Sequence, residues 1–383
     1  MNICIITSSF PSHSDDIVQA PFLIDFIEGL MKRSHRVFVF TQDRNGTKEA
    51  FLKNVQVKWF RWMKSKKPLV ILNPFKPSDC LRIVNLFRSG KRELIPFLKE
   101  NKIDACLGLW VLPGGYFANH GQRRTGIPYS VWALGSDIYR HGKNPFLYLV
   151  MKRIIHAARG VFADGFDLCR KMEDRFGRKC SFLPTTRKLA KPDAPNGLSR
   201  ANRRDRPYRF LFVGRIEKIK GIDLVLQSVA LLKEEEPDFH LTIVGKGGME
   251  EWARNFIKVK EIGGRVALIE NVSDPALASL YASSHCVVIP SRSESIPLVF
   301  SEALNFGKEL IVTDVGDMGM LGREYGVAWV VPPEDPVALK ESMKRKIEAR
   351  DKGETEKDVT KRAELRRLFN IETSVERFLA DYE

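Results

Sequence analysis

The segment that indicates the fold most directly is residues 286–304, CVVIPSRSESIPLVFSEAL. Its apolar run, Val287–Pro290, is typical of a buried strand, and the residues from Pro297 onwards are typical of a helix. Glu294 falls where the strand has ended, and Glu302 falls more than one turn inside the helix. Because helical side chains lean toward the N-terminus of their helix, we expect both carboxylates to face one crevice. The alternative is an acid in a helix and an acid on the surface, each without function.

The alternation of strand-like and helix-like segments continues along the whole chain, as in helices packed around a parallel sheet. Strands are expected at Asn2–Thr7, His35–Thr41, Ala105–Trp110, Tyr129–Ala133, Gly160–Ala163, Ser181–Leu183, Phe210–Val213, Leu241–Val244, Val266–Leu268, Val287–Pro290, Leu310–Thr313 and Ala328–Val331. Helices are expected, among others, at Phe22–Arg33, Asp79–Asn101, Asn144–Ala158, Ile222–Glu235 and Met249–Lys260.

The region from Lys188 to Arg209 interrupts this alternation. It contains three prolines, a glycine, few apolar residues and many basic ones, which predicts a linker or an exposed connection. A chain of 383 residues is also too long for one ordinary core. We therefore predict an α/β protein of two doubly wound, Rossmann-like domains, residues 1–187 and 210–365, joined by a linker over 188–209. In such sheets, ligands bind outside the carboxyl ends of the strands.

The composition is that of a soluble globular protein, with 44% hydrophobic and 28% charged residues. No apolar run is long enough for a spanning helix, and the N-terminal MNICIITSSFP lacks the basic start of a signal peptide. The six cysteines form no CxxC pair and no metal-ligand spacing, so we expect buried, reduced thiols in a cytoplasmic protein. The net charge of +15 suggests an anionic partner.

One segment interleaves aromatic and basic residues, VKWFRWMKSKK at 57–67. Such a segment could lie at the inner face of an anionic membrane, which would make the protein peripheral there. The alternative, slightly favoured, is an edge strand and a loop with a solvated charge run. No nucleic-acid-binding module is recognisable, so we do not expect nucleic acid as a partner.

The segment FVGRIEKIKG at 212–221 carries the clearest anion-binding pattern. A strand ends at Gly214, and Arg215 and Lys220 fall in the turn before a helix, where free N–H groups and the helix dipole already favour anions. A guanidinium fork and an ammonium at this turn predict a diphosphate site. A solvated basic turn is the alternative.

Two further turns follow strands in the same half of the chain. TIVGKGG at 242–248 places Gly245 after an apolar strand, where glycine permits close approach of a ligand or a plain turn. In ESIPLVFSE at 294–302, Pro297 suits the first turn of a helix, so the N–H groups of Leu298 and Val299 are expected at the helix mouth. Glu302 could then accept hydrogen bonds from ribose hydroxyls while the helix mouth holds phosphate.

In this order and spacing, FVGRIEKIKGIDLVLQSVALL, LTIVGKGG and ESIPLVFSE resemble the family 4 (group 1) retaining glycosyltransferases, whose fold is GT-B. The resemblance extends over essentially the whole chain. It includes ITSSFPSHSDDIVQAPFLIDFIEGL near the start, VWALGSDI, ADGFDLCRKM, KCSFLP, VPPEDPVALKESM and the closing FNIETSVERFLADYE. It implies an acceptor-binding first domain, a donor-binding second domain, a cleft between them, and a terminal helix over 366–383 that packs back on the first domain.

The resemblance also implies roles for individual residues. Arg215 and Lys220 would neutralise the donor diphosphate, Glu302 would hold the ribose, and Glu294 would contact the transferred sugar. Further donor contacts would come from Gly214, Gly245, Ser295, Pro297, Leu298 and Val299, and contacts to the acceptor or sugar from Gly135, Ser136 and Asp137. Transfer would retain configuration, with the leaving phosphate oxygen taking the proton of the acceptor.

No Asp-x-Asp is present to hold a divalent ion, so neither a metal nor another cofactor is expected; the nucleotide sugar is a substrate. The chain departs from the family where a histidine usually precedes Gly-Ser-Asp, because Leu134 stands there. The N-terminal loop, with DIVQAPF at 16–22, is also less glycine-rich than usual. The function expected is glycosyl transfer to a glycan, a lipid-linked acceptor or a small molecule in glycoconjugate or surface polysaccharide synthesis. The rivals are a nucleotide-sugar epimerase of the same fold and a catalytically weakened pseudo-glycosyltransferase that only binds.

Overall fold

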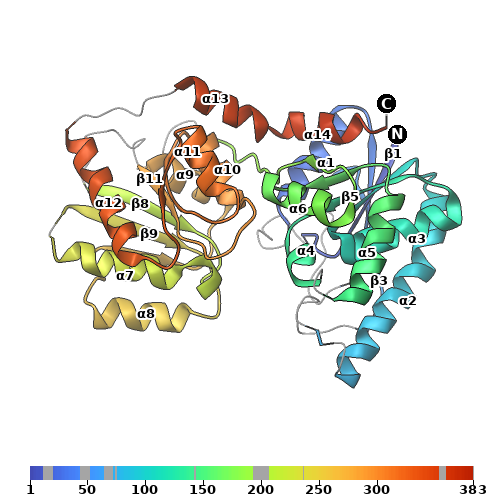
Figure 1. The fold of residues 1–383 in the computed structure, drawn as a ribbon, viewed down its shortest axis with the longest axis horizontal. Helices are drawn as coiled ribbons and strands as arrows, with labels where there is room; N and C mark the ends of the chain where they lie inside the picture. The colour runs from blue at the N-terminus through green and yellow to red at the C-terminus, as the bar shows by residue number, and fades with distance from the viewer. Residues whose placement is uncertain are drawn as a thin grey trace. The chain divides into compact units, whose positions relative to one another are not determined.

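The structure is a computed structural model, and it describes residues 1–11, 20–43, 52–63, 72–73, 76–141, 144–192, 207–235, 237–352 and 359–382. The chain forms two compact units (Figure 1). The first comprises Met1–Pro184 and Ile371–Glu383, and the second comprises Thr185–Asn370. The division after Pro184 lies slightly before the expected boundary at 187. Of the expected linker, residues 193–206 lie outside the described residues.

The first unit is built on a seven-stranded parallel sheet in the order β3-β2-β1-β4-β5-β6-β7. Its strands are β1 (Asn2–Thr7), β2 (Arg36–Gln42), β3 (Gln56–Phe60), β4 (Ala105–Leu109), β5 (Tyr129–Ala133), β6 (Val161–Ala163) and β7 (Ser181–Phe182). Its helices are α1 (Phe22–Lys32), α2 (Pro77–Glu100), η2 (Trp110–Gly115), α3 (Tyr116–Thr125), α4 (Ser136–His141), α5 (Pro145–Ala157), α6 (Phe166–Phe176) and α14 (Ile371–Leu379). The expected doubly wound fold is confirmed for this unit.

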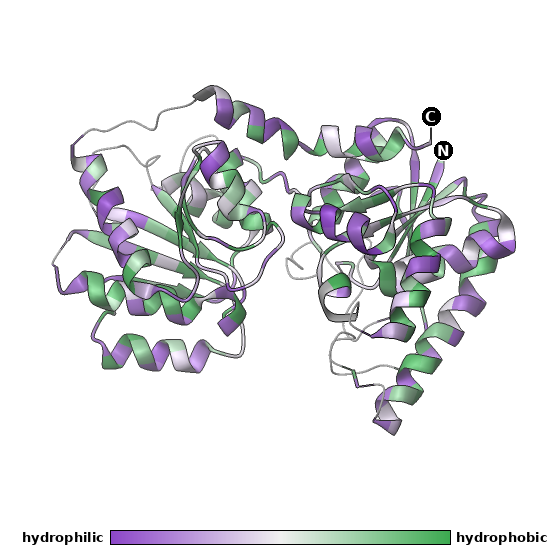
Figure 2. Cartoon of the chain, in the orientation of Figure 1, coloured by the Kyte–Doolittle hydropathy of each residue, from purple (hydrophilic) through white to green (hydrophobic). Residues whose placement is uncertain are grey.

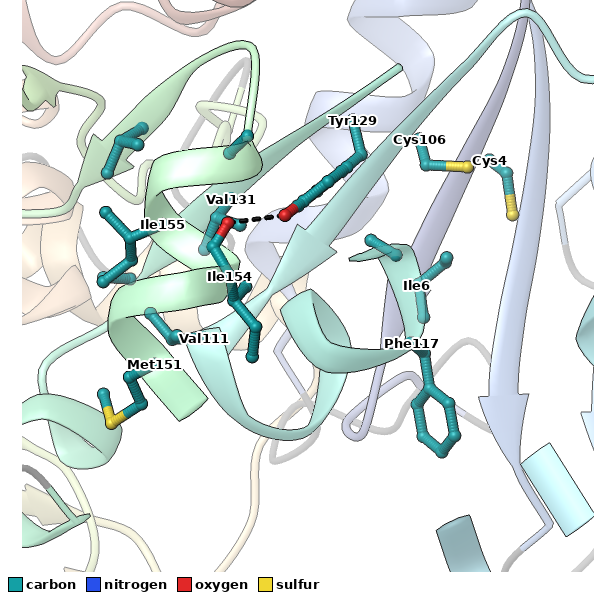
Figure 3. Close-up of a cluster of buried hydrophobic side chains, with 14 of the residues drawn as sticks. Cys4, Ile6, Cys106, Val111, Phe117, Tyr129, Val131, Met151, Ile154 and Ile155 are labelled. Atoms are coloured by element: carbon teal, nitrogen blue, oxygen red, sulfur yellow. Dashed lines mark hydrogen bonds between the residues drawn. The ribbon is translucent and has the colours of Figure 1, made fainter. Parts of the chain in front are cut away.

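Both faces of this sheet are covered by helices, which is why its strands are apolar on both sides (Figure 2). One face packs against α2, α3 and α5 through a cluster that includes Ile6, Phe117 and Met151 (Figure 3). The buried hydroxyl of Tyr129 in this cluster donates a hydrogen bond to the carbonyl of Ile154 on α5.

The C-terminal segment belongs to the first unit. Phe378 of α14 packs on Phe26 of α1, and Tyr382 shares a hydrogen bond of 2.9 Å with Ser130 of β5. The helix α14 begins at Ile371, whereas the expected terminal helix began at 366. The residues from 366 to 370 lie instead in the second unit.

The second unit contains a six-stranded parallel sheet in the order β10-β9-β8-β11-β12-β13. Its strands are β8 (Tyr208–Val213), β9 (Phe239–Val244), β10 (Val266–Ile269), β11 (Cys286–Ile289), β12 (Glu309–Thr313) and β13 (Ala328–Val331). Its helices are η3 (Lys218–Lys220), α7 (Ile222–Lys233), α8 (Glu250–Val259), α9 (Asp274–Ser283), α10 (Leu298–Asn305), α11 (Met318–Glu324), α12 (Pro336–Asp351) and α13 (Val359–Leu368). The strand order reverses between β8 and β11, so the turns after these two strands diverge at one point of the carboxyl edge.

Residues 57–60 of the aromatic and basic segment 57–67 belong to an edge strand. Residues 56–60 form β3, which pairs with β2. Phe60 is buried against Phe40, and the indole of Trp62 donates to the carbonyl of Asp43 at 2.7 Å. These two aromatic side chains therefore serve the packing of the first unit. Residues 64–67, and with them much of the basic run, lie outside the described residues.

All six cysteines are free thiols, five of them buried. Burial raises the pKa of Cys4 well above its usual value. Within the part of the chain that the structure describes, no helix has both the length and the apolarity to cross a bilayer.

Candidate functional site

The carboxyl edge of the second sheet gathers the turns that the sequence singled out. These turns are in close backbone contact, and glycine is required at the contacts. A Cβ added to Gly245 would lie 1.8 Å from the carbonyl oxygen of Gly214, and one added to Gly221 would lie 2.0 Å from that of Pro290. Gly316 has a φ of 55°, and its Cβ would lie 2.2 Å from the carbonyl oxygen of Glu294. The glycines thus bring the turns after β8, β9, β11 and β12 together.

Lys220 and Glu294 form an ion pair at this edge, although they are 74 positions apart in the chain. Lys220 ends the short helix η3, and Glu294 lies in the turn between β11 and α10. The hydroxyl of Ser291 donates to the same carboxylate oxygen, Oε1, at 3.2 Å. Both charged side chains keep part of their surface in contact with solvent, at 22% for Lys220 and 14% for Glu294. The pair therefore holds a partly open ammonium with hydrogens left for an anion.

Arg215 follows β8 in the same turn but does not join this pair. Its guanidinium is 57% exposed and donates to Glu217 at 2.7 Å through Nη1. The remaining N–H groups of a guanidinium with one such contact can still bind an anion. The structure thus places both expected cations after β8, with only Lys220 in contact with Glu294.

Arg292 fixes the two turns to each other, and the sequence argument did not assign it a role. Its guanidinium forms a bidentate pair with Asp223 at the start of α7, at 2.7 and 2.9 Å, and contacts Glu334 at 2.6 Å. These partners, Asp223 first, raise the pKa of Arg292 above its usual range. Its backbone N–H donates to the carbonyl of Ile219 at 2.9 Å. Arg292 therefore holds the turn of Lys220 against the turn of Glu294.

The helix α10 begins at Leu298, with Pro297 in an extended conformation as the N-cap. Pro297 thus precedes the helix, whereas the first helical turn was expected to contain it. Among the described residues, no acceptor lies on the backbone N–H of Leu298 or Val299, as expected at a helix mouth. The hydroxyl of Ser295, just before the helix, is buried and has no hydrogen-bond partner within the described parts of the chain.

Glu302 lies inside α10 in a buried network. It is 4% exposed, and its Oε2 accepts a hydrogen bond of 2.7 Å from the hydroxyl of Tyr281 on α9. Its Oε1 lies 3.8 Å from Nη1 of Arg187, which also pairs with Asp274 at the start of α9. Burial, and after it the charge of Glu302, raises the pKa of Tyr281 well above its usual value, so this phenol stays protonated and donates.

The first unit carries the third group of expected residues, at the carboxyl end of β5. Gly135 has a φ of 83°, and Ser136 begins the short helix α4. Asp137 is buried, and its Oδ2 accepts a hydrogen bond of 2.6 Å from the backbone N–H of Val111 in η2. Its Oδ1 is buried without a partner among the residues described. Burial raises the pKa of Asp137 to about 6, and the contact with Val111 only partly opposes this.

Three residues of the site, Arg187, Tyr281 and Arg292, could not be predicted from sequence motifs. Arg187 and Tyr281 lie 115 and 21 positions from Glu302 and occur in segments without a recognisable motif. Arg292 was within the opening segment, two residues before Glu294, but a lone arginine in a turn is indistinguishable from a solvated one. A pattern search over single turns cannot detect side chains that meet only through the fold.

Comparison with known proteins finds sequence matches mainly in the second unit. Residues 198–366 match the family described as glycosyl transferases group 1. The D-inositol 3-phosphate glycosyltransferase of Pseudarthrobacter chlorophenolicus is 35% identical over 115 residues, 29% of this chain and 27% of that protein. The α-D-kanosaminyltransferase of Streptomyces kanamyceticus is 26% identical over 144 residues, 38% of this chain and 37% of that protein. The chain thus matches about a third of the length of these curated relatives.

Solved structures match over the whole chain. Sucrose-phosphate synthase from Thermosynechococcus elongatus has a TM-score of 0.74 at 18% identity, covering 100% of this chain and 98% of that one. Anabaena Alr3699/HepE in complex with UDP-glucose has a TM-score of 0.73 at 15% identity, covering 99% and 98%. The chain therefore has the two Rossmann-like domains of the GT-B fold, and its residues 198–366 match the group 1 glycosyltransferase model.

Proposed function

We propose that this protein is a retaining glycosyltransferase that transfers a sugar from a nucleoside diphosphate sugar to an acceptor hydroxyl. The observation that carries the proposal is the contact between Lys220 and Glu294 beside the mouth of α10, within the domain that matches the group 1 family. The solved relative with bound UDP-glucose supports a donor of this class and makes UDP the first nucleotide to test.

The site suits the departure of a diphosphate. As the bond to the sugar breaks, negative charge grows on the leaving phosphate oxygen, and cations fixed near it stabilise that charge. Lys220 keeps hydrogens free beside its contact with Glu294, and Arg215 keeps N–H groups beside its contact with Glu217. The N–H groups of Leu298 and Val299 and the dipole of α10 add to this stabilisation.

Retention follows if the acceptor approaches the face that the diphosphate leaves. The acceptor oxygen then bonds to the anomeric carbon, the bond from that carbon to the phosphate oxygen breaks, and the acceptor proton passes to that phosphate oxygen. Glu294 would accept a hydrogen bond from the transferred sugar, because its Oε2 has no hydrogen-bond partner among the described residues. Glu302 would accept from the ribose, and Gly214, Gly245, Ser295 and Pro297 would line the donor site.

The acceptor is proposed to be a glycan or a lipid-linked molecule bound by the first unit. Asp137, with Gly135 and Ser136, lies at the carboxyl edge of that unit's sheet, where ligands of such sheets bind. Leu134, which directly precedes them, is half-buried. It is an apolar residue at the position where the resembling family usually has a histidine. A deoxygenated or otherwise less polar sugar would suit this substitution.

Transfer is proposed to need no metal, since Lys220 and Arg215 supply two compensating charges. A chelator such as EDTA should leave the rate unchanged, and added Mg²⁺ should not restore a rate lost in Lys220→Ala. The free thiols favour a cytoplasmic location, where nucleotide sugars would reach the site.

The test is release of sugar or its transfer from a panel of UDP-, GDP- and ADP-sugars, with the anomeric configuration of the product read by NMR. Glu294→Ala should abolish turnover, whereas Glu251→Ala, an exposed acid on α8, should not change it. Donor binding without turnover by the unmodified protein would favour a pseudo-glycosyltransferase. Conversion of the donor to its epimer with no transfer would favour an epimerase.

A further inference from the structure

Two helices of the first unit expose large apolar side chains at the same spacing. On α2 these are Leu81 and Val84, which are 62% and 57% exposed. On α5 they are Phe146 and Leu149, which are 72% and 64% exposed. Residues three apart lie on one side of a helix, so each pair forms a continuous apolar surface. Exposed apolar pairs of this size are costly to leave in water, and they indicate surfaces that are covered in use.

On each helix an arginine lies one turn after the second residue of the apolar pair. Arg88 follows Leu81 and Val84 at the i+7 position, and Arg153 follows Phe146 and Leu149 at the i+7 position. Both arginines are exposed, and neither pairs with a carboxylate among the described residues. The two helices thus repeat one pattern of apolar, apolar and cationic residues. We call these six side chains the α2–α5 face.

The surroundings of the α2–α5 face are also cationic. Helix α3 packs against both α2 and α5 (Figure 1), and the sequences of α3 and α5 contain no acidic residue. On α3, burial first and then the charges of Lys91, Arg124 and Arg123 lower the pKa of His120. Lys91 of α2 and Arg123 and Arg124 of α3 therefore all lie near His120. Helices α3 and α5 thus add cations, and no acidic side chains, to the surroundings of the α2–α5 face.

The apolar pairs occupy the N-terminal parts of their helices. In a parallel sheet, the chain leaves a strand at its carboxyl end and returns through the helix, so these parts lie toward the carboxyl edge of the sheet. Asp137 and η2 are at the same edge. The apolar pairs thus lie toward the edge at which an acceptor would bind.

We propose that the α2–α5 face binds the surface of an anionic lipid bilayer. Exposed Phe and Leu beside unpaired Arg is the side-chain chemistry of interfacial binding, because the apolar groups enter the acyl boundary while the cations contact lipid phosphates. This surface differs from the aromatic and basic segment 57–67, in which Phe60 and Trp62 are used in packing. The proposal does not depend on glycosyl transfer, although a lipid-linked acceptor would give the binding a purpose.

The experiment measures sedimentation of the full chain with vesicles of phosphatidylglycerol and phosphatidylcholine in equal amounts, and with vesicles of phosphatidylcholine alone. One variant carries Phe146→Ser, Leu149→Ser and Arg153→Glu, and a second carries Leu81→Ser, Val84→Ser and Arg88→Glu. The matched control carries Val259→Ser, Val337→Ser and Lys258→Glu, which remove two exposed apolar groups and reverse one cation in the second unit.

The expected result is binding to the anionic vesicles that weakens with salt, falls about tenfold or more in each variant, and is unchanged in the control. Binding by either variant equal to that of the unmodified protein would overturn the proposal, as would equal loss in the control. A dimer in solution that both variants convert to a monomer would assign the face to a second copy instead. A DNA or RNA duplex that binds the same face more tightly than the vesicles would also refute it.

Folding of the variants is checked by thermal unfolding and by nucleotide binding, which involves the second unit. If a triple variant unfolds, Arg153→Glu and Arg88→Glu alone still test the cations, because both side chains are exposed. Vesicle binding is measured without donor or acceptor. A protein that binds vesicles but turns over no donor would therefore contradict the proposed function and leave this inference standing.

Discussion

The hydroxyl of Tyr281 donates a hydrogen bond of 2.7 Å to Oε2 of Glu302, and both side chains are buried within the second unit. A buried carboxylate needs such donors, because burial without them disfavours its charge. This bond fixes the direction of the Glu302 carboxylate. Glu302 is thus a pre-oriented acceptor, which matters if it holds a ribose.

Replacing Tyr281 with Phe should therefore lower both stability and nucleotide affinity. Loss of a hydrogen bond to a charged group costs about 1.5–3 kcal/mol of unfolding free energy. We expect the affinity for the nucleoside diphosphate to fall about tenfold with little change in kcat. Calorimetric titration measures the affinity, and a 2′,3′-dideoxy nucleotide should show no difference between the two proteins.

Tyr208→Phe is the matched control, because its buried hydroxyl donates to Glu309 at 3.0 Å in the same unit. It should lower stability without changing nucleotide affinity. Equal losses of affinity in the two variants would show that Tyr281 acts only through the stability of the unit.

We expect the charge of Arg187 to stabilise the second unit through its ion pair with Glu302. Breaking a buried ion pair by removing one partner costs about 3–5 kcal/mol, because the other charge is left uncompensated. Arg187→Met should therefore destabilise the second unit strongly, and adding Glu302→Gln should recover part of the loss. Chemical denaturation of the two single variants and the double variant measures the coupling. Strict additivity would mean that the distance of 3.8 Å between the two side chains carries no energetic coupling.

We expect turnover to require Lys220 but not Lys218 of the same short helix. Lys220→Ala removes a cation beside the expected diphosphate, and we expect kcat to fall about 100-fold or more. Lys218→Ala removes an exposed cation from the same short helix and should change kcat less than threefold. Steady-state kinetics with saturating donor measures both. Equal effects would indicate that general positive charge, rather than this position, supports turnover.

We expect that Gly316 cannot be replaced, because the carbonyl oxygen of Glu294 lies against it and because its φ is positive. Gly316→Ala would place a Cβ 2.2 Å from the carbonyl oxygen of Glu294, so the turn that carries Glu294 must move. Gly326 has a similar positive φ of 61° but open space around it. We expect Gly326→Ala to cost only the strain of a left-handed residue, about 1–2 kcal/mol, and to keep activity. Gly316→Ala should cost more and reduce turnover at least tenfold, as measured by thermal unfolding and by kinetics.

Asp137 should make the first unit less stable as the pH rises from about 4 to 6. Its pKa is raised in the folded protein to about 6, so the folded state binds the proton more tightly than the unfolded state. Stability is therefore fully present below the unfolded pKa and is lost as the pH rises through the folded pKa, by about 3 kcal/mol in total. Asp137→Asn can keep the acceptor for the N–H of Val111 and does not ionise. The difference between the unfolding temperatures of the two proteins should grow across this pH range, and a constant difference would contradict the assignment.

The strands could be predicted well because parallel strands covered on both faces are continuous apolar runs. The predicted strands Val287–Pro290 and Leu241–Val244 show this clearly, and the structure contains them as Cys286–Ile289 and Phe239–Val244. The turn after Leu241–Val244 could be predicted because glycine is required where the backbone makes a close contact, as at Gly245. The cation and the acid of the central pair, Lys220 and Glu294, could also be assigned from their motifs.

The environment of Glu302 could not be predicted, because it depends on side chains from distant segments. Helical periodicity predicts that Glu302 faces the same crevice as Glu294, but it could not show that Tyr281 and Arg187 contact the Glu302 carboxylate. The segment 57–67 has the composition of an interfacial segment, but packing decides which aromatic side chains are available. Composition could not show that α2 and α5 each carry a pair of exposed apolar side chains.

The most direct test of the account is a calorimetric titration of UDP, GDP and ADP into the unmodified protein, Lys220→Ala and Lys218→Ala. We predict that one of the three nucleotides binds selectively, that Lys220→Ala loses at least tenfold in affinity for it, and that Lys218→Ala does not. No binding of any nucleoside diphosphate, or equal affinity in the unmodified protein and Lys220→Ala, would contradict a donor site at the contact between Lys220 and Glu294.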